Sequence, residues 1–522
     1  MKDPVKVSGF LFLLLFALNL SVRPATGFQT LAARVQDFGA IGDGITDDSA
    51  ALQNAIDGLP TNAVLDFGGA SFTYLISRPL TLHPNSAYTG AATIKMSSSA
   101  PVTPIAILAY GQASNVTIDG LTFDGNGVAG GINIDVGGGA SIPADNIRIT
   151  NSTFRNTPAR PTGGGEDAIY DPVGILNSVI QGNSFINCGG GILLADAGNL
   201  QILNNNFDTI TQDDAIYLLF PANPIPYGSQ IVVSGNQGKN LARMAVEFWG
   251  PGGDAVDGPV ISQNIFQQWT SPQFGISVMV GKGARLDSNF LMDGTGSYGI
   301  ELGAPYSQVT NNVVSGFATG IAVHHGQNSL LGNNLLMNQA GAGILVSNAP
   351  GSKSNLTISD NYIQDAQSAG IFTNTSDWGA SIVTGNTIVR NIGAWPTDTA
   401  WRYSGMSLTP PVTPVTIKNN RVSGSGTTLA LGFVYVAFQV NGPSQSNAGT
   451  VYDSNTIDTS LGSPFGIGFN GNSQGSMDGV VIKNNSFQNL WKVTGGAPSL
   501  QVVVEGNSAT NCLTLGPVQL IF

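Results

Sequence analysis

The 522-residue chain has few charged residues. Asp, Glu, Lys and Arg make up only 10% of it, with 32 acidic against 20 basic side chains and a net charge of −12. Nucleic-acid binding requires clustered lysine and arginine. We therefore predict no nucleic-acid partner, and the acids that occupy strand positions become the candidates for chemistry.

Cysteine and histidine are also scarce. The two cysteines, Cys188 and Cys512, lie far apart in the sequence, so we expect buried thiols and no disulfide. His83, His324 and His325 do not follow a metal-ligand pattern. We predict no metal site and no obligatory cofactor.

Long apolar runs are confined to the N-terminus. Residues 10–18 are apolar but too few to span a bilayer. They follow Lys2 and Lys6 and precede the small residues at 25–27, an order typical of a secretory signal peptide. We predict a signal peptide over residues 1–27. The mature chain would be secreted, extracellular or periplasmic, without membrane association.

Glycine and asparagine mark a repeat. An "Asn-x-Phe, short gap, Gly-Ile-x-Leu" unit begins at Asn183 and recurs to Asn361 in steps of 22 to 31 residues. Such self-similarity indicates a solenoid. Strands of three to five residues with alternating apolar and polar side chains predict an all-β chain. We predict one single-stranded parallel β-helix domain over residues 28–522, in which corner asparagines stack and pair amide to amide.

Residues 35–58 predict a cap for the open end of the solenoid. Leu52, Ala55 and Ile56 form the apolar side of a short helix that Asp47, Asp48 or Ser49 can cap. The stretch resembles the N-terminal segment of secreted carbohydrate-active β-helices, namely pectate-lyase-like proteins, polygalacturonases, rhamnogalacturonases and phage tailspikes. The resemblance rests on the segments 37–40 (DFGA), 42–44 (GDG) and 46–48 (TDD). It implies a right-handed, pectin-lyase-like coil that acts on a polysaccharide, and it leaves monomer and homotrimer open.

The candidate catalytic residues are carboxylates on consecutive coils. The run 213–217 (DDAIY) is nearly repeated at 166–170 (EDAIY). Alternation directs Glu247 outward in the column of Tyr217, and Glu301 shares this column two coils on. With coils about 4.8 Å apart, Glu247 should lie one coil from the aspartate pair and Asp167 two coils away. Paired carboxylates at such spacings suit glycoside hydrolysis. The run 213–216 also resembles the Asp-Asp strand of polygalacturonases, which carries catalytic carboxylates. The predicted catalytic residues are Asp213, Asp214, Glu247 and Asp167.

Other side chains are predicted to bind substrate. They are Tyr217, Trp249, Tyr170, Arg243, Glu301 and His324, with Phe220 and Trp269 as further rings for stacking on sugars. The insertion at 391–413 is expected to shape a binding face.

The favoured interpretation is a secreted glycoside hydrolase. Two alternatives stay open. One is a lyase or epimerase acting on uronates, with Ca²⁺ and the cations Lys239, Arg243, Lys282 or Arg285. The other is a non-catalytic, tailspike-like glycan-binding protein.

Overall fold

The computed structural model describes residues 32–390 with gaps at 101–105, 110–113, 135–141, 160–166, 223–229 and 271–273. Beyond 390 it describes 404–409, 411–424, 436–441, 449–459, 465–470, 480–488, 492–495, 503–510 and 512. The predicted signal peptide lies outside these residues.

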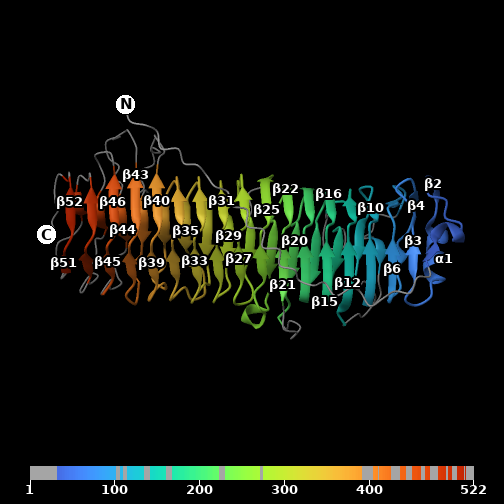
Figure 1. Ribbon diagram of the computed structural model, residues 1–522, viewed down its shortest axis with the longest axis horizontal. Helices are drawn as coiled ribbons and strands as arrows, with labels where there is room; N and C mark the ends of the chain where they lie inside the picture. The colour runs from blue at the N-terminus through green and yellow to red at the C-terminus, as the bar shows by residue number, and fades with distance from the viewer. Residues whose placement is uncertain are drawn as a thin grey trace, which may run out of the picture.

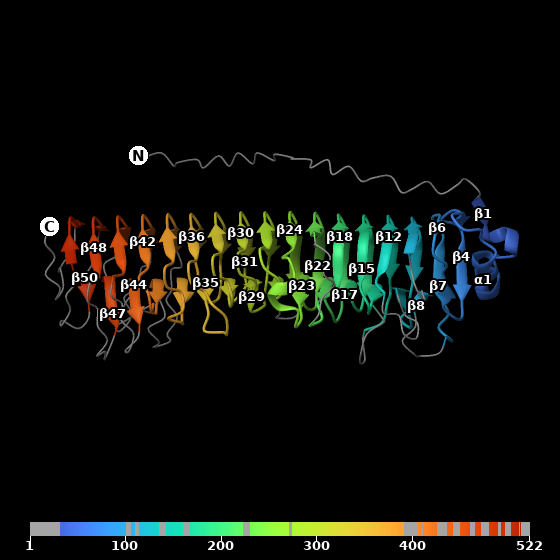
Figure 2. The same cartoon turned by 90° about the horizontal axis from the view of Figure 1, so that it is seen from below.

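The described chain winds into a long parallel β-helix (Figures 1 and 2). Each full coil supplies one strand to each of three sheets, A, B and C, and every strand pairs in parallel with its counterpart in the next coil. Apolar side chains point inward, and the core runs along the axis. The predicted all-β solenoid is confirmed.

Sheet A consists of β1 (Ala32–Arg34), β3 (Val64–Asp66), β6 (Ser86–Thr89), β9 (Ser114–Asp119), β12 (Ala144–Thr150), β15 (Ile175–Gln181), β18 (Ala197–Leu203), β21 (Ile231–Ser234), β24 (Val260–Ser262), β27 (Arg285–Asp287), β30 (Gln308–Thr310), β33 (Leu330–Gly332), β36 (Thr357–Ser359), β39 (Ile382–Thr384), β42 (Thr416–Lys418), β45 (Val451–Asp453), β48 (Val481–Lys483) and β51 (Val503–Glu505).

Sheet B consists of β2 (Asp43–Asp47), β4 (Thr73–Ile76), β7 (Thr93–Met96), β10 (Thr122–Asp124), β13 (Thr153–Arg155), β16 (Ser184–Cys188), β19 (Asn206–Ile210), β22 (Gln237–Leu241), β25 (Ile265–Trp269), β28 (Phe290–Met292), β31 (Val313–Ser315), β34 (Leu335–Met337), β37 (Tyr362–Gln364), β40 (Thr387–Arg390), β43 (Arg421–Gly424), β46 (Thr456–Thr459), β49 (Ser486–Gln488) and β52 (Ser508–Thr510).

Sheet C consists of β5 (Leu80–Thr81), β8 (Ala106–Ala109), β11 (Gly130–Asn133), β14 (Ile169–Asp171), β17 (Ile192–Ala195), β20 (Ile216–Leu219), β23 (Val246–Trp249), β26 (Ile276–Val278), β29 (Tyr298–Leu302), β32 (Thr319–Val323), β35 (Ala342–Val346), β38 (Ala369–Thr373), β41 (Ser404–Leu408), β44 (Val436–Asn441), β47 (Phe465–Asn470) and β50 (Lys492–Gly495).

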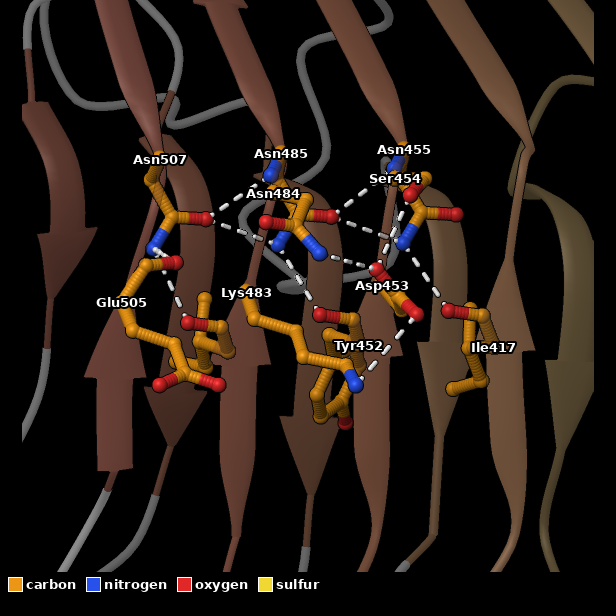
Figure 3. Close-up of polar contacts among 11 residues, drawn as sticks. Ile417, Tyr452, Asp453, Ser454, Asn455, Lys483, Asn484, Asn485, Glu505 and Asn507 are labelled. Atoms are coloured by element: carbon orange, nitrogen blue, oxygen red, sulfur yellow. Dashed lines mark hydrogen bonds and ion pairs between the residues drawn. The ribbon is translucent and has the colours of Figure 1, made fainter.

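A buried asparagine ladder fixes the corner between sheets A and B. At each rung a residue with left-handed backbone, such as Asn311 (φ 58°), precedes a buried asparagine, such as Asn312. The buried amide accepts from the previous asparagine, Asn289, and donates to the next one, Asn334, at 2.9 and 3.0 Å. The ladder runs through Asn183, Asn205, Asn236, Asn264, Asn289, Asn312, Asn334, Asn361, Asn386, Asn420, Asn455, Asn485 and Asn507. Figure 3 shows its last three rungs, and the predicted pairing is confirmed.

Stacked phenylalanines follow the ladder inside the helix. The rings of Phe123, Phe154, Phe185 and Phe207 stack on consecutive coils with centroids 5.1, 5.2 and 4.6 Å apart. The next coil has Gly238 at this position, and Phe266 of the following coil occupies the space that a side chain would need there. Cys188 and Cys512 are both free; Cys188 is buried as predicted, whereas Cys512 is partly exposed.

A helix covers the N-terminal end, as the sequence predicts. After η1 (Val35–Phe38), α1 (Ser49–Asp57) takes the place of a first sheet C strand and packs against β5 with Leu52, Ala55 and Ile56 buried (Figure 2). Asp47 accepts a hydrogen bond from the backbone N–H of Ser49 at 2.9 Å. Asp48 sits at the N-cap position but makes no cap hydrogen bond with its side chain.

The carboxylate of Asp48 instead anchors the preceding turn. It is buried and accepts from the backbone N–H groups of Ile41 (2.7 Å) and Gly42 (3.1 Å). We expect Asp48→Ala to destabilise the cap by about 2 kcal/mol, because two donors lose a charged acceptor. Thermal melting measures this loss. Asp57→Ala, which removes exposed contacts with His83 and Gln53, is the control and should change stability by less than about 1 kcal/mol.

Candidate functional site

The candidate site lies on the outer face of sheet C. Strand register places Tyr217, Glu247, Ser277 and Glu301 side by side on β20, β23, β26 and β29. This confirms the predicted shared column of Tyr217, Glu247 and Glu301. The column follows from alternation, since the residues on either side of each of these positions point into the core.

Arg243 holds three of the predicted acids together. Its Nη1 lies 3.2 Å from Oδ1 of Asp213, in direct contact with Oδ2 of Asp214, and 2.9 Å from Oε2 of Glu247. The contact with Glu247 is an ion pair without hydrogen-bond geometry, since no hydrogen-bond donor in the described part of the chain reaches that buried oxygen. The guanidinium also lies over the Tyr217 ring, 5.7 Å from its centroid. We call Asp213, Asp214, Arg243 and Glu247 the acid cluster.

The three acids of the cluster differ in exposure. The side chain of Asp213 is 15% exposed, that of Glu247 6%, and that of Asp214 is completely buried. Oδ1 of Asp214 accepts from the backbone N–H of Met244 at 2.8 Å. Asp213 and Glu247 therefore face solvent more than Asp214, which is fixed beneath them.

The side chain of Asp167 lies beside the acid cluster because the coil between them carries a glycine, Gly190. It lies two coils from Asp214, as predicted, and Gly190 is its neighbour on the coil between. A Cβ added at Gly190 would lie 1.9 Å from Oδ1 of Asp167 and 3.3 Å from Cβ of Asp213. The glycine thus lets the Asp167 carboxylate occupy the space beside Asp213.

Burial and charge shift the titration of the acid cluster. Burial raises the pKa of Asp214 well above 3.8; Arg243 opposes this rise, while the charge of Glu247 and a hydrogen bond with it add to it. Burial also raises the pKa of Tyr217 to about 12, with a further contribution from Glu247. Burial therefore favours the neutral form of the Asp214 carboxyl more than that of an exposed aspartate.

The raised pKa of Asp214 predicts a dependence of stability on pH. The Asp214 carboxyl binds its proton more tightly in the folded chain than in the unfolded chain. The free energy of unfolding that it contributes therefore falls as the pH rises from about 4 through the pKa of Asp214 in the folded chain. Asp214→Asn mimics the protonated form. We expect an unchanged melting temperature at about pH 4 and a higher one than wild type at about pH 8.

Calorimetry at the two pH values tests this expectation. Asp208→Asn, which removes the partly exposed ion pair with Lys239 on sheet B, is the control and should change the free energy of unfolding by at most about 1 kcal/mol. A lower melting temperature of Asp214→Asn at the higher pH would contradict the raised pKa.

A second polar cluster lies along the same face. Glu301 accepts from the Ser277 hydroxyl at 2.6 Å and contacts Nε2 of His324 at 3.1 Å. Nδ1 of His324 lies 2.6 Å from Oγ of Ser347. Our sequence reasoning found Glu301 and His324 but missed Ser277 and Ser347. The outward position of Ser277, one coil from Glu247, was a signal that could have identified it.

The predicted aromatic and basic residues divide between the surface and the core. Trp249 is 48% exposed, and Tyr170 and Tyr217 are half-buried, so these three can contact a ligand. The prediction that Phe220 and Trp269 offer stacking surfaces is wrong, because both are buried in the core.

Lys239 and Arg285 lie on sheets B and A, and Lys282 lies in an exposed turn. Most of the predicted 391–413 insertion, 391–403 and 410, lies outside the described residues.

A surface hollow adjoins the site. It has a volume of about 280 Å³ and lies at the corner between sheets B and C. Its described lining is uncharged and consists of Asn126, Gly127, Asn156, Thr157 and Asn187. The backbone N–H of Gly189, next to Gly190, donates to Oγ1 of Thr157 at 3.0 Å, which connects the hollow to the coil beside Asp167.

The described part of the chain contains neither a group of metal ligands nor a membrane-spanning helix. No group of three or more His, Cys, Asp or Glu there is arranged to hold a metal ion. No helix there is long and apolar enough to cross a membrane.

Comparison with known families identifies the fold. The model described as right handed beta helix region matches residues 88–290 and 245–400, together more than half of the chain. The chain belongs to the right-handed β-helix family. A second model, described as rhamnogalacturonase A/epimerase, pectate lyase-like, matches residues 32–103. The handedness and the pectate-lyase-like N-terminal segment implied by the sequence are thus confirmed. No curated protein sequence matches this β-helix.

Solved structures resemble this right-handed β-helix at low identity. One is the A-module of mannuronan C-5 epimerase AlgE4 from Azotobacter vinelandii, with 15% identity, 93% of this chain and 98% of that chain covered, and a TM-score of 0.34. Another is a family 28 exopolygalacturonase from Yersinia enterocolitica, with 14% identity, 83% and 79% coverage and a TM-score of 0.39. A third is a tailspike protein of E. coli bacteriophage HK620 in complex with a pentasaccharide, with 11% identity, 92% and 78% coverage and a TM-score of 0.40. At these values the resemblances carry no argument about activity.

Proposed function

We propose that this β-helix is an exported glycoside hydrolase that binds a polysaccharide along sheet C. The observation that carries the proposal is the gathering of three carboxyl groups around Arg243, in which Asp214 is completely buried while Asp213 and Glu247 reach the surface. Glycoside hydrolysis needs one carboxyl that donates a proton and a second carboxylate that activates water or attacks the sugar. Neighbouring carboxyls with different environments provide that division of roles.

We assign the roles by exposure. Glu247 donates a proton to the glycosidic oxygen as the bond from that oxygen to the anomeric carbon breaks. Asp213 accepts a proton from the attacking water, or attacks the anomeric carbon itself. Asp214 has no exposed side-chain surface, so it is a positioning residue that holds Arg243 beside Asp213 and Glu247. Trp249 and Tyr217 flank the substrate, and Asp167, Glu301 and His324 extend the face on either side.

The test uses the mature protein with a panel of neutral and acidic polysaccharides, with and without EDTA. New reducing ends are measured together with the ultraviolet absorbance of unsaturated uronates. The hydrolase predicts reducing ends without absorbance, lost in Asp213→Asn and Glu247→Gln and kept in Asp208→Asn. Absorbance that EDTA removes would replace it with a lyase, and binding without either signal would leave a glycan-binding protein.

A further inference from the structure

The coils that carry the site contain few cations. Residues 167–347 include four basic side chains, Lys239, Arg243, Lys282 and Arg285, against twelve acidic ones. Lys239 lies on β22 of sheet B, 3.2 Å from Asp208, and Arg285 begins β27 of sheet A. Lys282 lies before β27, where its backbone pairs with that of Asp257 in an isolated β-bridge. Of these four side chains, only that of Arg243 lies at sheet C.

Arg243 is already engaged by the protein. Its Nη1 contacts the carboxylates of Asp213, Asp214 and Glu247, and its guanidinium lies over the Tyr217 ring. A sugar carboxylate would have to displace these partners to form a bidentate ion pair with the guanidinium of Arg243. The displaced carboxylate of Glu247 is buried, and leaving a buried charge uncompensated is costly.

The rest of the face adds negative charge. Asp167 lies beside Asp213, and Glu301 lies two strands beyond Glu247 in the same outward column. A polyuronate carries one negative charge on every sugar. At physiological salt the Debye length is about 8 Å, so charges bound directly against this face would be repelled.

Uncharged sugars meet no such opposition. Carboxylates accept hydrogen bonds from sugar hydroxyls, and the half-exposed Trp249 offers a ring for stacking. The adjoining hollow has amide and hydroxyl groups among its described residues and no charged side chain. From the engaged arginine and the acidic face, we infer that the polysaccharide bound along sheet C is a neutral glycan and not a polyuronate. This inference rests on the proposed binding of polysaccharide to sheet C.

The decisive experiment compares polymers that differ only in charge. Native polyuronates are each paired with the same polymer after chemical reduction of its carboxyl groups to alcohols, and neutral plant and bacterial glycans complete the set. Affinity electrophoresis of the Glu247→Gln protein measures binding without turnover. We expect retardation by at least one neutral polymer, unchanged between about 0.01 M and about 1 M salt, and none by the native polyuronates with or without Ca²⁺.

Two matched variants locate the binding. Trp249→Ala is expected to weaken neutral-glycan binding at least about tenfold, since stacking on an aromatic ring is lost. Tyr362→Ala removes a comparably exposed ring from sheet B and should leave binding unchanged.

Tighter binding of any native polyuronate than of its reduced form, or no binding of any neutral polymer, would overturn the inference. Cleavage of a polyuronate that releases reducing ends without ultraviolet absorbance would overturn the inference but not hydrolysis. Neutral-glycan binding without cleavage by the wild-type protein would overturn hydrolysis but not the inference.

Discussion

Replacing Asn312 by leucine is expected to destabilise the β-helix by about 4–6 kcal/mol. Its Oδ1 accepts from both the backbone N–H and the side-chain amide of Asn289, and its Nδ2 donates to the Leu286 carbonyl and to Asn334. Leucine satisfies none of these buried groups, and each unsatisfied group costs about 1–3 kcal/mol. Urea denaturation followed by circular dichroism measures the loss.

Asn311→Gly is the matched control for this substitution. Asn311 adopts the left-handed backbone that glycine tolerates, and its side chain donates only an exposed hydrogen bond to Asp287, so we expect a loss of at most about 1 kcal/mol. Equal stability of the Asn312 variant and its control would show that the ladder contributes little. Because repeat proteins can unfold in parts, the comparison is made on the midpoint of the transition that includes the central coils.

Glu247→Gln is expected to lower turnover of the polysaccharide about 10³-fold. The amide keeps the size of the side chain but cannot donate the proton that general acid catalysis requires, a contribution of about 10²–10⁴-fold. Substrate binding should survive, so the loss falls on kcat with little change in KM. Release of reducing ends under initial-rate conditions measures both constants.

The control replaces a glutamate on another face. Glu505→Gln changes an exposed residue at the end of β51 in sheet A and should retain wild-type turnover. Full activity of Glu247→Gln would contradict the role assigned to Glu247. A substrate with an activated leaving group needs little acid assistance, and we expect it to restore much of the rate in this variant.

Much of the fold could be predicted because it repeats. The spacing of Asn183 and its successors identifies the solenoid, and a buried corner amide that recurs on each coil can only be satisfied by its neighbours. Alternation also placed Glu247 and Glu301 in one outward column, because the strands of sheet C are in register from coil to coil.

The details of the site could not be predicted from the same rules. Asp213 and Asp214 precede the first residue of β20, where alternation does not determine direction, and only the packed structure shows Asp214 buried. The contact of Arg243 with three carboxylates depends on the rotamers of these side chains, which the strand pattern of the sequence does not determine. The aromatic residues Phe220, directly after β20, and Trp269, at the end of β25, were misjudged because residue type alone does not reveal which side chains face the core where a strand ends.

Hydroxyl-radical footprinting tests most directly whether sheet C is the ligand-binding face. The Glu247→Gln protein is oxidised with and without a saturating neutral polysaccharide, and side-chain oxidation is quantified by mass spectrometry. Three of the exposed rings serve as probes, namely Trp249 on sheet C and Phe290 and Tyr362 on sheet B. We predict protection of Trp249 with unchanged oxidation of Phe290 and Tyr362. Protection of the two sheet B rings with Trp249 unchanged would contradict a site on sheet C.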